Sequence, residues 1–111
     1  MIKDRRSGSE RRETERLGVN IEIEWEGLTG RKTGTLGDIS VRGCFVLCSG
    51  DVEDGEIVKI FLPLADKMQV QFWSEVANHI YEIGFAVRFI ELTDAQKDFL
   101  KKFVAALGKV K

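Results

Sequence analysis

Apolar and polar residues alternate without a break from position 19 to position 26. Val19, Ile21, Ile23 and Trp25 are separated by Asn20, Glu22, Glu24 and Glu26. Successive side chains of a β-strand point to opposite faces, so this period of two predicts a strand with one buried face and one wet face.

Five further strands are predicted at intervals marked by turn residues. They cover positions 31–36, 43–48, 56–62, 68–80 and 82–90. The segment 38–43 is expected to connect the second strand to the third. Pro63 is expected to end the fourth strand, because proline has no N–H to give to a sheet. The last two strands are predicted to form a hairpin about Tyr81.

The end of the chain predicts one amphipathic helix. Thr93 and Gln96 have the spacing of a capping box, and Gly108 is expected to stop the helix. Apolar residues then recur on one helical face: Phe99, Leu100, Phe103, Val104 and Leu107. Six short strands and one helix indicate a mainly β fold, a six-stranded antiparallel β-barrel with the C-terminal helix packed on it.

Length and charge narrow the function classes. The 111 residues suit one domain with its own core, and 17 Lys and Arg against 18 Asp and Glu give a net charge of −1. This balance argues against a generally basic nucleic-acid-binding protein. We find no uncharged apolar stretch of the ~18 residues that span a bilayer, and no apolar core of a secretory signal near the start, so we expect a cytoplasmic protein without a transmembrane segment.

The positive charge is concentrated at the N-terminus. Residues 1–16 contain six basic and four acidic side chains, whereas residues 17–111 contain 11 basic and 14 acidic ones. With almost nothing apolar to bury, residues 1–16 are expected to form a flexible basic arm on a domain that covers residues 17–111.

Metal and thiol chemistry are not indicated. Two cysteines and His79 are too few for a typical four-ligand zinc site. On one strand, Cys44 and Cys48 would lie ~13 Å apart, which is too far for a disulfide. We expect both to be reduced and to pack as small hydrophobic residues.

Three short motifs occur in order along the chain. Arg12 and Arg16 form RxxxR, Asp38 to Gly43 fits DxSxxG, and residues 84–89 read GFAVRF. Together they resemble the PilZ domain family, the bacterial receptor modules for cyclic dimeric GMP (c-di-GMP). The resemblance covers nearly the whole chain. It implies a barrel with the arginine arm across one side and DxSxxG on the surface below it.

The chemistry of these residues agrees with that resemblance. An arginine fork can hold a phosphate or the O6 and N7 atoms of guanine through two hydrogen bonds, or can stack on a base. Arg12 and Arg16 are therefore the leading ligand-binding candidates, and Arg11 is a third. Asp38 suits the N–H donors of guanine. Ser40 can bridge to the ligand or hold the turn, and Gly43 is expected to let backbone and ligand approach closely.

Some positions differ from the common family pattern. Glu13 and Glu15 lie between the motif arginines, where they would repel a dianionic ligand unless they point away or pair with Arg6 or Arg11. Asn78 stands where many members have an aromatic residue near the ligand. Arg42, in a position that the motif leaves free, could add a cationic contact.

The expected function is a non-enzymatic c-di-GMP receptor with no other cofactor. Binding would order the arm and change the surface offered to a downstream protein partner, in a monomer or weak homodimer. The main alternative is a ligand-independent PilZ-like adaptor for protein–protein interaction. A single-stranded nucleic-acid-binding barrel is a third reading, disfavoured by Glu22, Glu24 and Glu26 on the wet face of the first strand. An enzyme is the weakest reading, because we find no nucleophile or phosphate-loop motif.

Overall fold

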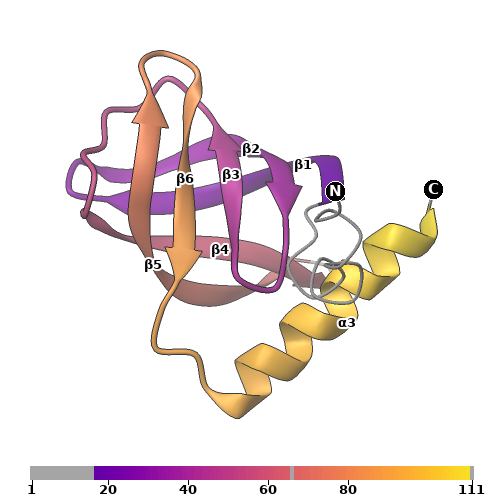
Figure 1. Ribbon diagram of the computed structural model, residues 1–111. Coiled ribbons are helices and arrows are strands. Elements are labelled where there is room, and N and C mark those ends of the chain that lie inside the picture. Colours follow the sequence, from indigo (N-terminus) through magenta and orange to yellow (C-terminus); the bar gives the residue numbers. More distant parts are fainter. Residues whose placement is uncertain (1–16, 66, 111) are drawn as a thin grey trace, which may run out of the picture.

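A computed structural model describes residues 17–65 and 67–110 of the chain (Figure 1). The basic arm, with Arg11, Arg12 and Arg16, lies outside the described residues. The elements in chain order are β1 (Leu17–Gly27), β2 (Gly30–Ile39), β3 (Gly43–Leu47), β4 (Ile57–Ala65), β5 (Met68–Ile80), β6 (Gly84–Phe89) and α3 (Asp94–Val110).

The strands close into an antiparallel barrel in the order β1-β2-β3-β6-β5-β4, as expected from the alternating pattern. The barrel is shut by three pairs between β1 and β4, from Glu24 with Phe61 to Glu26 with Lys59. The inward positions of all six strands form one core. Its largest fully buried side chains include Trp25, Leu36, Ile60, Phe72 and Phe85.

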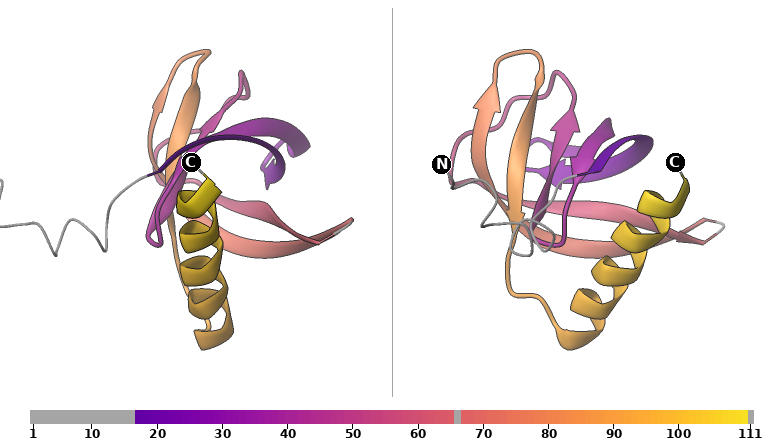
Figure 2. Two further views of the ribbon diagram at one scale, coloured as in Figure 1. Left: turned by 90° about the vertical axis from the view of Figure 1, so that its right-hand side faces the viewer. Right: turned by 45° about the vertical axis from the view of Figure 1, so that its right-hand side comes forward.

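Helix α3 packs against one side of the barrel (Figure 2). It begins with the predicted capping box. The Thr93 N–H donates to Gln96 Oε1 at 2.9 Å, and the Gln96 N–H donates to Thr93 Oγ1 at 3.0 Å. Gln96 Nε2 also donates to the carbonyl of Gln71 in β5 at 2.9 Å. Leu100 is fully buried, and the ring centroid of Phe99 lies 5.9 Å from that of Phe72. The stripe predicted from the sequence therefore contacts the barrel.

Three predicted boundaries are wrong for identifiable reasons, and several other strand ends differ by one or two residues from the predicted ranges. Strand β2 runs on to Ile39, so the connection to β3 is only residues 40–42. Strand β4 continues through Pro63, which is tolerated because β1 pairs with β4 only as far as Phe61 and leaves β4 with one neighbour there. Helix α3 passes through Gly108, since one glycine in a last turn costs only about 1 kcal/mol.

The predicted hairpin and the apolar packing of both cysteines are confirmed, although Cys48 lies just after the end of β3. The hairpin about Tyr81 joins β5 to β6 through residues 81–83. Cys44 is buried, Cys48 is half-buried against the core, and no disulfide joins the two. Among the described residues, no helix has the length and apolar character needed to cross a membrane.

Candidate functional site

The described half of the predicted site lies where β2 passes into β3. Asp38 is the penultimate residue of β2, residues 40–42 form the connection, and Gly43 opens β3. At the same place the chain enters the barrel, because Leu17 pairs with Ile39 and Gly18 pairs with Asp38. The segment that carries RxxxR is thus joined to the barrel directly beside DxSxxG.

A β-bulge makes Asp38 face outward. In a regular strand the residue two positions after a core residue also faces the core, and Asp38 comes two positions after the buried Leu36. The pairing skips Gly37, however, so that Leu36 pairs with Val46, Asp38 with Phe45, and Ile39 with Cys44. The extra residue restores Ile39 to the core and leaves the Asp38 side chain on the outer face.

A second bulge does the same for Asn78 in β5. Val76 pairs with the core residue Val87, the pairing skips Ala77, and Asn78 then pairs with Ala86. The next residue, His79, pairs with the fully buried Phe85, so Asn78 lies on the outer face. Both bulges occur immediately before a residue that the motifs and the family resemblance had singled out.

The two bulges create one outward-facing row across five strands, which we call the outer row. It consists of Gly18, Asp38, Phe45, Ala86 and Asn78, each paired with the next. Asp38 and Asn78 are separated by three strand spacings, roughly 14 Å along the sheet. The structure therefore places these two predicted residues on the same face, at a distance that a ligand would have to bridge.

Phe45 is a member of the outer row that the sequence analysis did not single out. It lies between Asp38 and Ala86 and is only half-buried, although its neighbours Cys44 and Val46 belong to the core. Its ring lies against Gly84 of β6, where an added Cβ would be 2.9 Å from the ring atom Cε2. The apolar run from Cys44 to Leu47 has no alternation that would have revealed an outward-facing residue.

Ser40 holds the connection between β2 and β3. Its side chain is 1% exposed, and its Oγ accepts the N–H of Arg42 at 3.1 Å. The Ser40 N–H donates to the carbonyl of Gly43 at 2.9 Å. Of the two roles expected for Ser40, the structure shows the structural one, a closed short turn.

Gly43 is required by the barrel itself. A Cβ at this position would collide with the carbonyl oxygen of Val87, because β3 and β6 approach closely there. The glycine was expected to make room for a ligand, whereas the atoms that crowd it belong to the neighbouring strand. Arg42 is exposed, and its carbonyl accepts the N–H of Phe89 at 2.9 Å.

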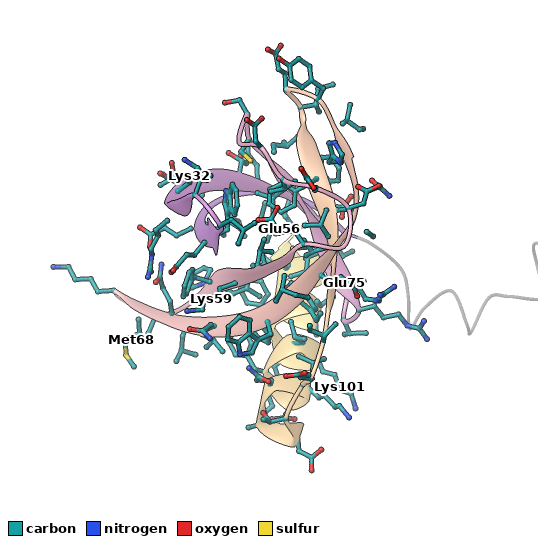
Figure 3. The ribbon with its side chains drawn as sticks, turned by 90° about the vertical axis from the view of Figure 1, so that its left-hand side faces the viewer. Lys32, Glu56, Lys59, Met68, Glu75 and Lys101 are labelled. Atoms are coloured by element: carbon teal, nitrogen blue, oxygen red, sulfur yellow. The ribbon has the colours of Figure 1, made fainter. Side chains whose placement is uncertain are left out.

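A cationic side chain borders the outer row. Arg88 pairs with Gly43 and is exposed on the same face, where its Nη2 lies 2.7 Å from Oε1 of Glu75 (Glu75 is labelled in Figure 3). Arg42 directly precedes Gly43 in the chain, and Arg88 is the partner of Gly43 on β6. The outer row therefore combines an acceptor, an aromatic ring and an amide, and two cationic side chains lie beside it toward the 40–42 connection.

Comparisons with known proteins agree with this geometry. The model of the PilZ domain family matches residues 10–106. No curated protein matches the chain. Among solved structures, the PilZ domain of CeSA from a cellulose-synthesizing bacterium has a TM-score of 0.69 at 19% identity, over 86% of this chain and 99% of its own.

Two longer solved proteins share the fold. Borreliella burgdorferi PlzA, solved in complex with c-di-GMP, has a TM-score of 0.65 at 11% identity, over 88% of this chain and 43% of its own. The Bacillus subtilis inhibitor of motility MotI/DgrA has a TM-score of 0.73 at 14% identity, over 91% of this chain and 52% of its own. At these identities the likeness concerns the fold alone. With the family match over nearly the whole length, with DxSxxG at the turn between β2 and β3, and with the six-stranded barrel and its helix, the chain belongs to the PilZ domain family.

Proposed function

We propose that this protein is a receptor for c-di-GMP, and not an enzyme, in which the RxxxR arm and the outer row hold the ligand together. The observation that carries the proposal is the pairing of Leu17 with Ile39 and of Gly18 with Asp38. This pairing joins the arm to the barrel at the DxSxxG motif, although 22 positions separate Arg16 from Asp38 in the sequence.

The chemistry of each side chain determines which part of the ligand it binds. The guanidinium groups of Arg12 and Arg16 bind phosphate oxygens or the O6 and N7 atoms of guanine, and Arg11 adds a stacking or capping contact. The outward carboxylate of Asp38 accepts from the N1 and N2 donors of a guanine, which arginine cannot satisfy. This pairing of donors with an acceptor gives selectivity for guanine over adenine.

Phe45 supplies the stacking surface that Asn78 cannot. A base that lies on the outer row beside Asp38 would cover the exposed part of the Phe45 ring, and stacking on an aromatic ring contributes ~1–3 kcal/mol per base. Asn78, at the far end of the row, offers hydrogen bonds from its amide. Arg42 adds a cationic contact to the ligand.

Binding is coupled to ordering of the arm. We expect the arm to become ordered when the ligand binds, and the cost of ordering it reduces the net affinity. The ordered arm and ligand present a new surface to a protein partner. PlzA, a protein of the same fold that was solved in complex with c-di-GMP, supports the barrel as the platform for this function.

Isothermal titration calorimetry on the full chain tests the proposal. We expect binding of c-di-GMP in the micromolar range, which corresponds to about −8 kcal/mol, and much weaker binding of c-di-AMP and GTP. In a parallel amide-exchange experiment, residues 5–16 should gain protection when c-di-GMP is added. Absence of binding at millimolar c-di-GMP would instead favour the ligand-independent adaptor.

A further inference from the structure

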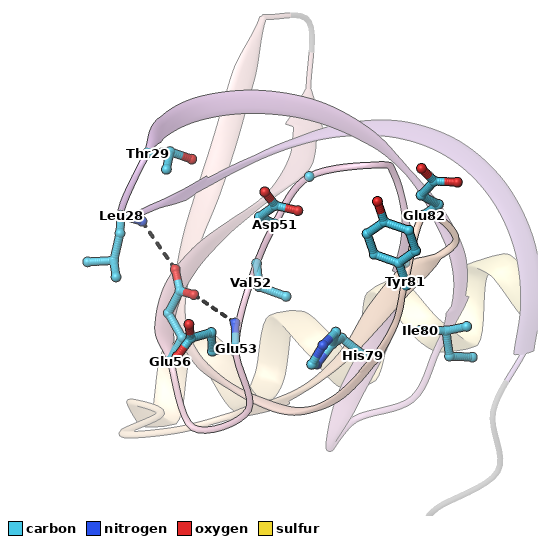
Figure 4. Close-up of a pocket in the computed structure, with 12 residues that line it drawn as sticks. Leu28, Thr29, Asp51, Val52, Glu53, Glu56, His79, Ile80, Tyr81 and Glu82 are labelled. Atoms are coloured by element: carbon cyan, nitrogen blue, oxygen red, sulfur yellow. Dashed lines mark hydrogen bonds between the residues drawn. The ribbon is translucent and has the colours of Figure 1, made fainter.

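A cavity of about 500 Å³ opens at the end of the barrel where β5 turns into β6 (Figure 4). We call it the acidic cup. Three segments build it: the β1–β2 turn, the β3–β4 loop and the β5–β6 hairpin. Its main lining side chains are Leu28, Asp51, Glu53, Glu56, Tyr81 and Glu82.

The acidic cup lies at the opposite end of β3 and β6 from the 40–42 connection. Leu47 pairs with Gly84 at the cup, whereas Gly43 pairs with Arg88 at the connection.

Side-chain hydrogen bonds hold the three segments together. Glu56 accepts the N–H of Leu28 at 3.2 Å through Oε2 and the N–H of Glu53 at 3.0 Å through Oε1, so it joins the β1–β2 turn to the β3–β4 loop. His79 Nδ1 is hydrogen-bonded to Asp54 Oδ1 at 2.8 Å, which joins β5 to the same loop. A cavity that is already built requires little ordering when a partner enters it.

The carboxylates that line the cup give it a negative charge. Glu56 is occupied by its two backbone donors, and Asp51, Glu53 and Glu82 present further carboxylates. Among the described residues that line the cup, none is Lys or Arg. The alkyl chain of Lys32 reaches Gly50 from outside the lining. Phosphate-bearing ligands and anionic lipids would be repelled here, whereas a cationic side chain would be attracted.

The rim of the cup is apolar and unusually exposed. Leu28 is 87% exposed, Tyr81 is 75% exposed and Ile80 is 50% exposed. Large apolar side chains gathered around a cavity are typical of a protein-binding site. Tyrosine in particular is enriched at the centres of such interfaces.

The floor of the cup covers a buried donor. The indole of Trp25 lies directly beneath Gly50, where an added Cβ would be 2.8 Å from Cζ2. Its Nε1 is buried and has no hydrogen-bond partner among the residues that the structure describes. Because the Trp25 ring lies against Gly50 of the lining, its indole N–H resonance is a suitable reporter for a ligand in the cup.

We propose that the acidic cup binds a peptide segment of a protein partner in which Lys or Arg is flanked by large apolar residues. The cationic groups face Asp51, Glu53 and Glu82, and the apolar groups cover Leu28 and Tyr81. The cup shares no lining residue with the outer row, although the two adjoin at Gly84, against which the Phe45 ring lies. The proposal does not depend on c-di-GMP binding.

The test is an NMR titration of the ¹⁵N-labelled full chain. The probe is a capped six-residue peptide of alternating leucine and arginine, and two matched peptides replace arginine by glutamate or leucine by serine. We expect the first peptide to shift the amides of residues 50–56 and 79–84 and the indole N–H of Trp25. The indole N–H of Trp73, on the outer face of β5, is the internal control.

Two variants make the test specific. Glu82→Lys should weaken the leucine–arginine peptide about threefold or more, in the range of one partly exposed ion pair, and added salt should weaken it further. Glu22→Lys carries the same charge change on the wet face of β1 and should leave the affinity unchanged. Equal effects of the two variants, equal binding of the glutamate peptide, or shifts only outside the cup would overturn the proposal. Shifts of the cup amides with protein concentration alone would assign the cup to a second copy of this chain and would also overturn it.

Discussion

Asp38 and Asn78 face the same outer surface of the barrel because each directly follows a β-bulge, at Gly37 in β2 and at Ala77 in β5. Neither residue would face outward if its strand kept plain alternation after Leu36 or Val76. Bulges commonly redirect a side chain next to a functional site. Their occurrence just before both residues supports the outer row as the ligand-binding face, and the predictions below test it.

The two motif arginines should dominate nucleotide binding. Arg12→Ala or Arg16→Ala is expected to weaken c-di-GMP at least about tenfold, because each removes a bidentate contact worth ~1–3 kcal/mol. Calorimetric titration of the full chain measures the change. Arg5→Ala, which removes the same charge from the arm outside the motif, is the control. Unchanged affinity in both motif variants would refute the assignment.

Substitutions at Asp38 and Ser40 should have different effects, the first on ligand affinity and the second on the stability of the fold. Asp38→Asn removes the carboxylate that accepts from guanine, so c-di-GMP affinity should fall about tenfold or more. Ser40→Ala removes the buried acceptor of the Arg42 N–H, so the free energy of unfolding should fall by about 1 kcal/mol or more. Thermal unfolding and calorimetry on both variants distinguish the two roles. A reversed pattern would contradict them.

Phe45 should contribute through its aromatic ring. Phe45→Leu retains an apolar side chain but removes the stacking surface, and we expect c-di-GMP to bind roughly fivefold to tenfold more weakly, within the ~1–3 kcal/mol of base stacking. Phe45→Tyr keeps the ring and should restore the affinity. If Leu binds as well as Phe, the nucleotide does not lie on the outer row between Asp38 and Ala86.

Gly43 should matter for folding. Gly43→Ala places a Cβ against the backbone carbonyl of Val87, so β3 must move away from β6, and the free energy of unfolding is expected to fall by ~1–3 kcal/mol. Gly18→Ala is the matched control, because an added Cβ there meets no atom within 4 Å among the described residues. Urea unfolding of the two variants measures the difference. Equal stability would show that β3 adapts without cost.

One surface carboxyl should show a pH effect. The pKa of Glu24 lies below its ordinary value, chiefly because the Arg31 side chain donates two hydrogen bonds to Oε1 at 2.7 and 2.9 Å, and also because Gln69 donates to the same oxygen at 3.4 Å. A lowered pKa in the folded state stabilises the protein above the ordinary value, and this contribution is lost as the pH falls through the lowered one.

The measurement is an NMR titration of the Glu24 side-chain carboxyl. Arg31→Gln should raise the pKa of Glu24, because it removes the leading cause of the shift. Arg88→Gln, which removes an arginine paired with Glu75 instead, should leave the pKa of Glu24 where it is. A pKa of Glu24 that does not respond to Arg31→Gln would show that Arg31 is not the cause.

The strands, the helix and its cap could be predicted because their signals are local. Alternation around Trp25 and the spacing of Thr93 and Gln96 need only neighbouring residues. The end of β4 was missed for a non-local reason. Whether Pro63 breaks a strand depends on how far β1 extends alongside it, which the sequence near Pro63 does not encode.

Less of the site could be predicted, because it depends on sheet register. The motifs identified Asp38, Ser40 and Gly43. In the structure, however, Ser40 holds the turn between β2 and β3, and Gly43 leaves room for the backbone of β6. One sign of the first bulge can be read from the sequence. The core residues Leu36 and Ile39 are three positions apart, whereas plain alternation places core residues an even number of positions apart. The outward position of Phe45 depends on the pairing of β3 with β2 and β6, and the acidic cup is built from three segments distant in sequence. Neither can be read from neighbouring residues in the sequence.

The buried hydroxyl of Ser40 and the crowded Gly43 have a consequence for recognising receptors among related barrels. Ser40 and Gly43, two of the three fixed residues of D-x-S-x-x-G, have structural roles in this protein. A related barrel that no longer binds nucleotide would therefore be expected to keep both of them. A pattern search that weighs the three letters equally would count such a barrel as a sensor. If the proposed function holds, Asp38 together with the arginine pair upstream is the part of the pattern that distinguishes a sensor from such a barrel.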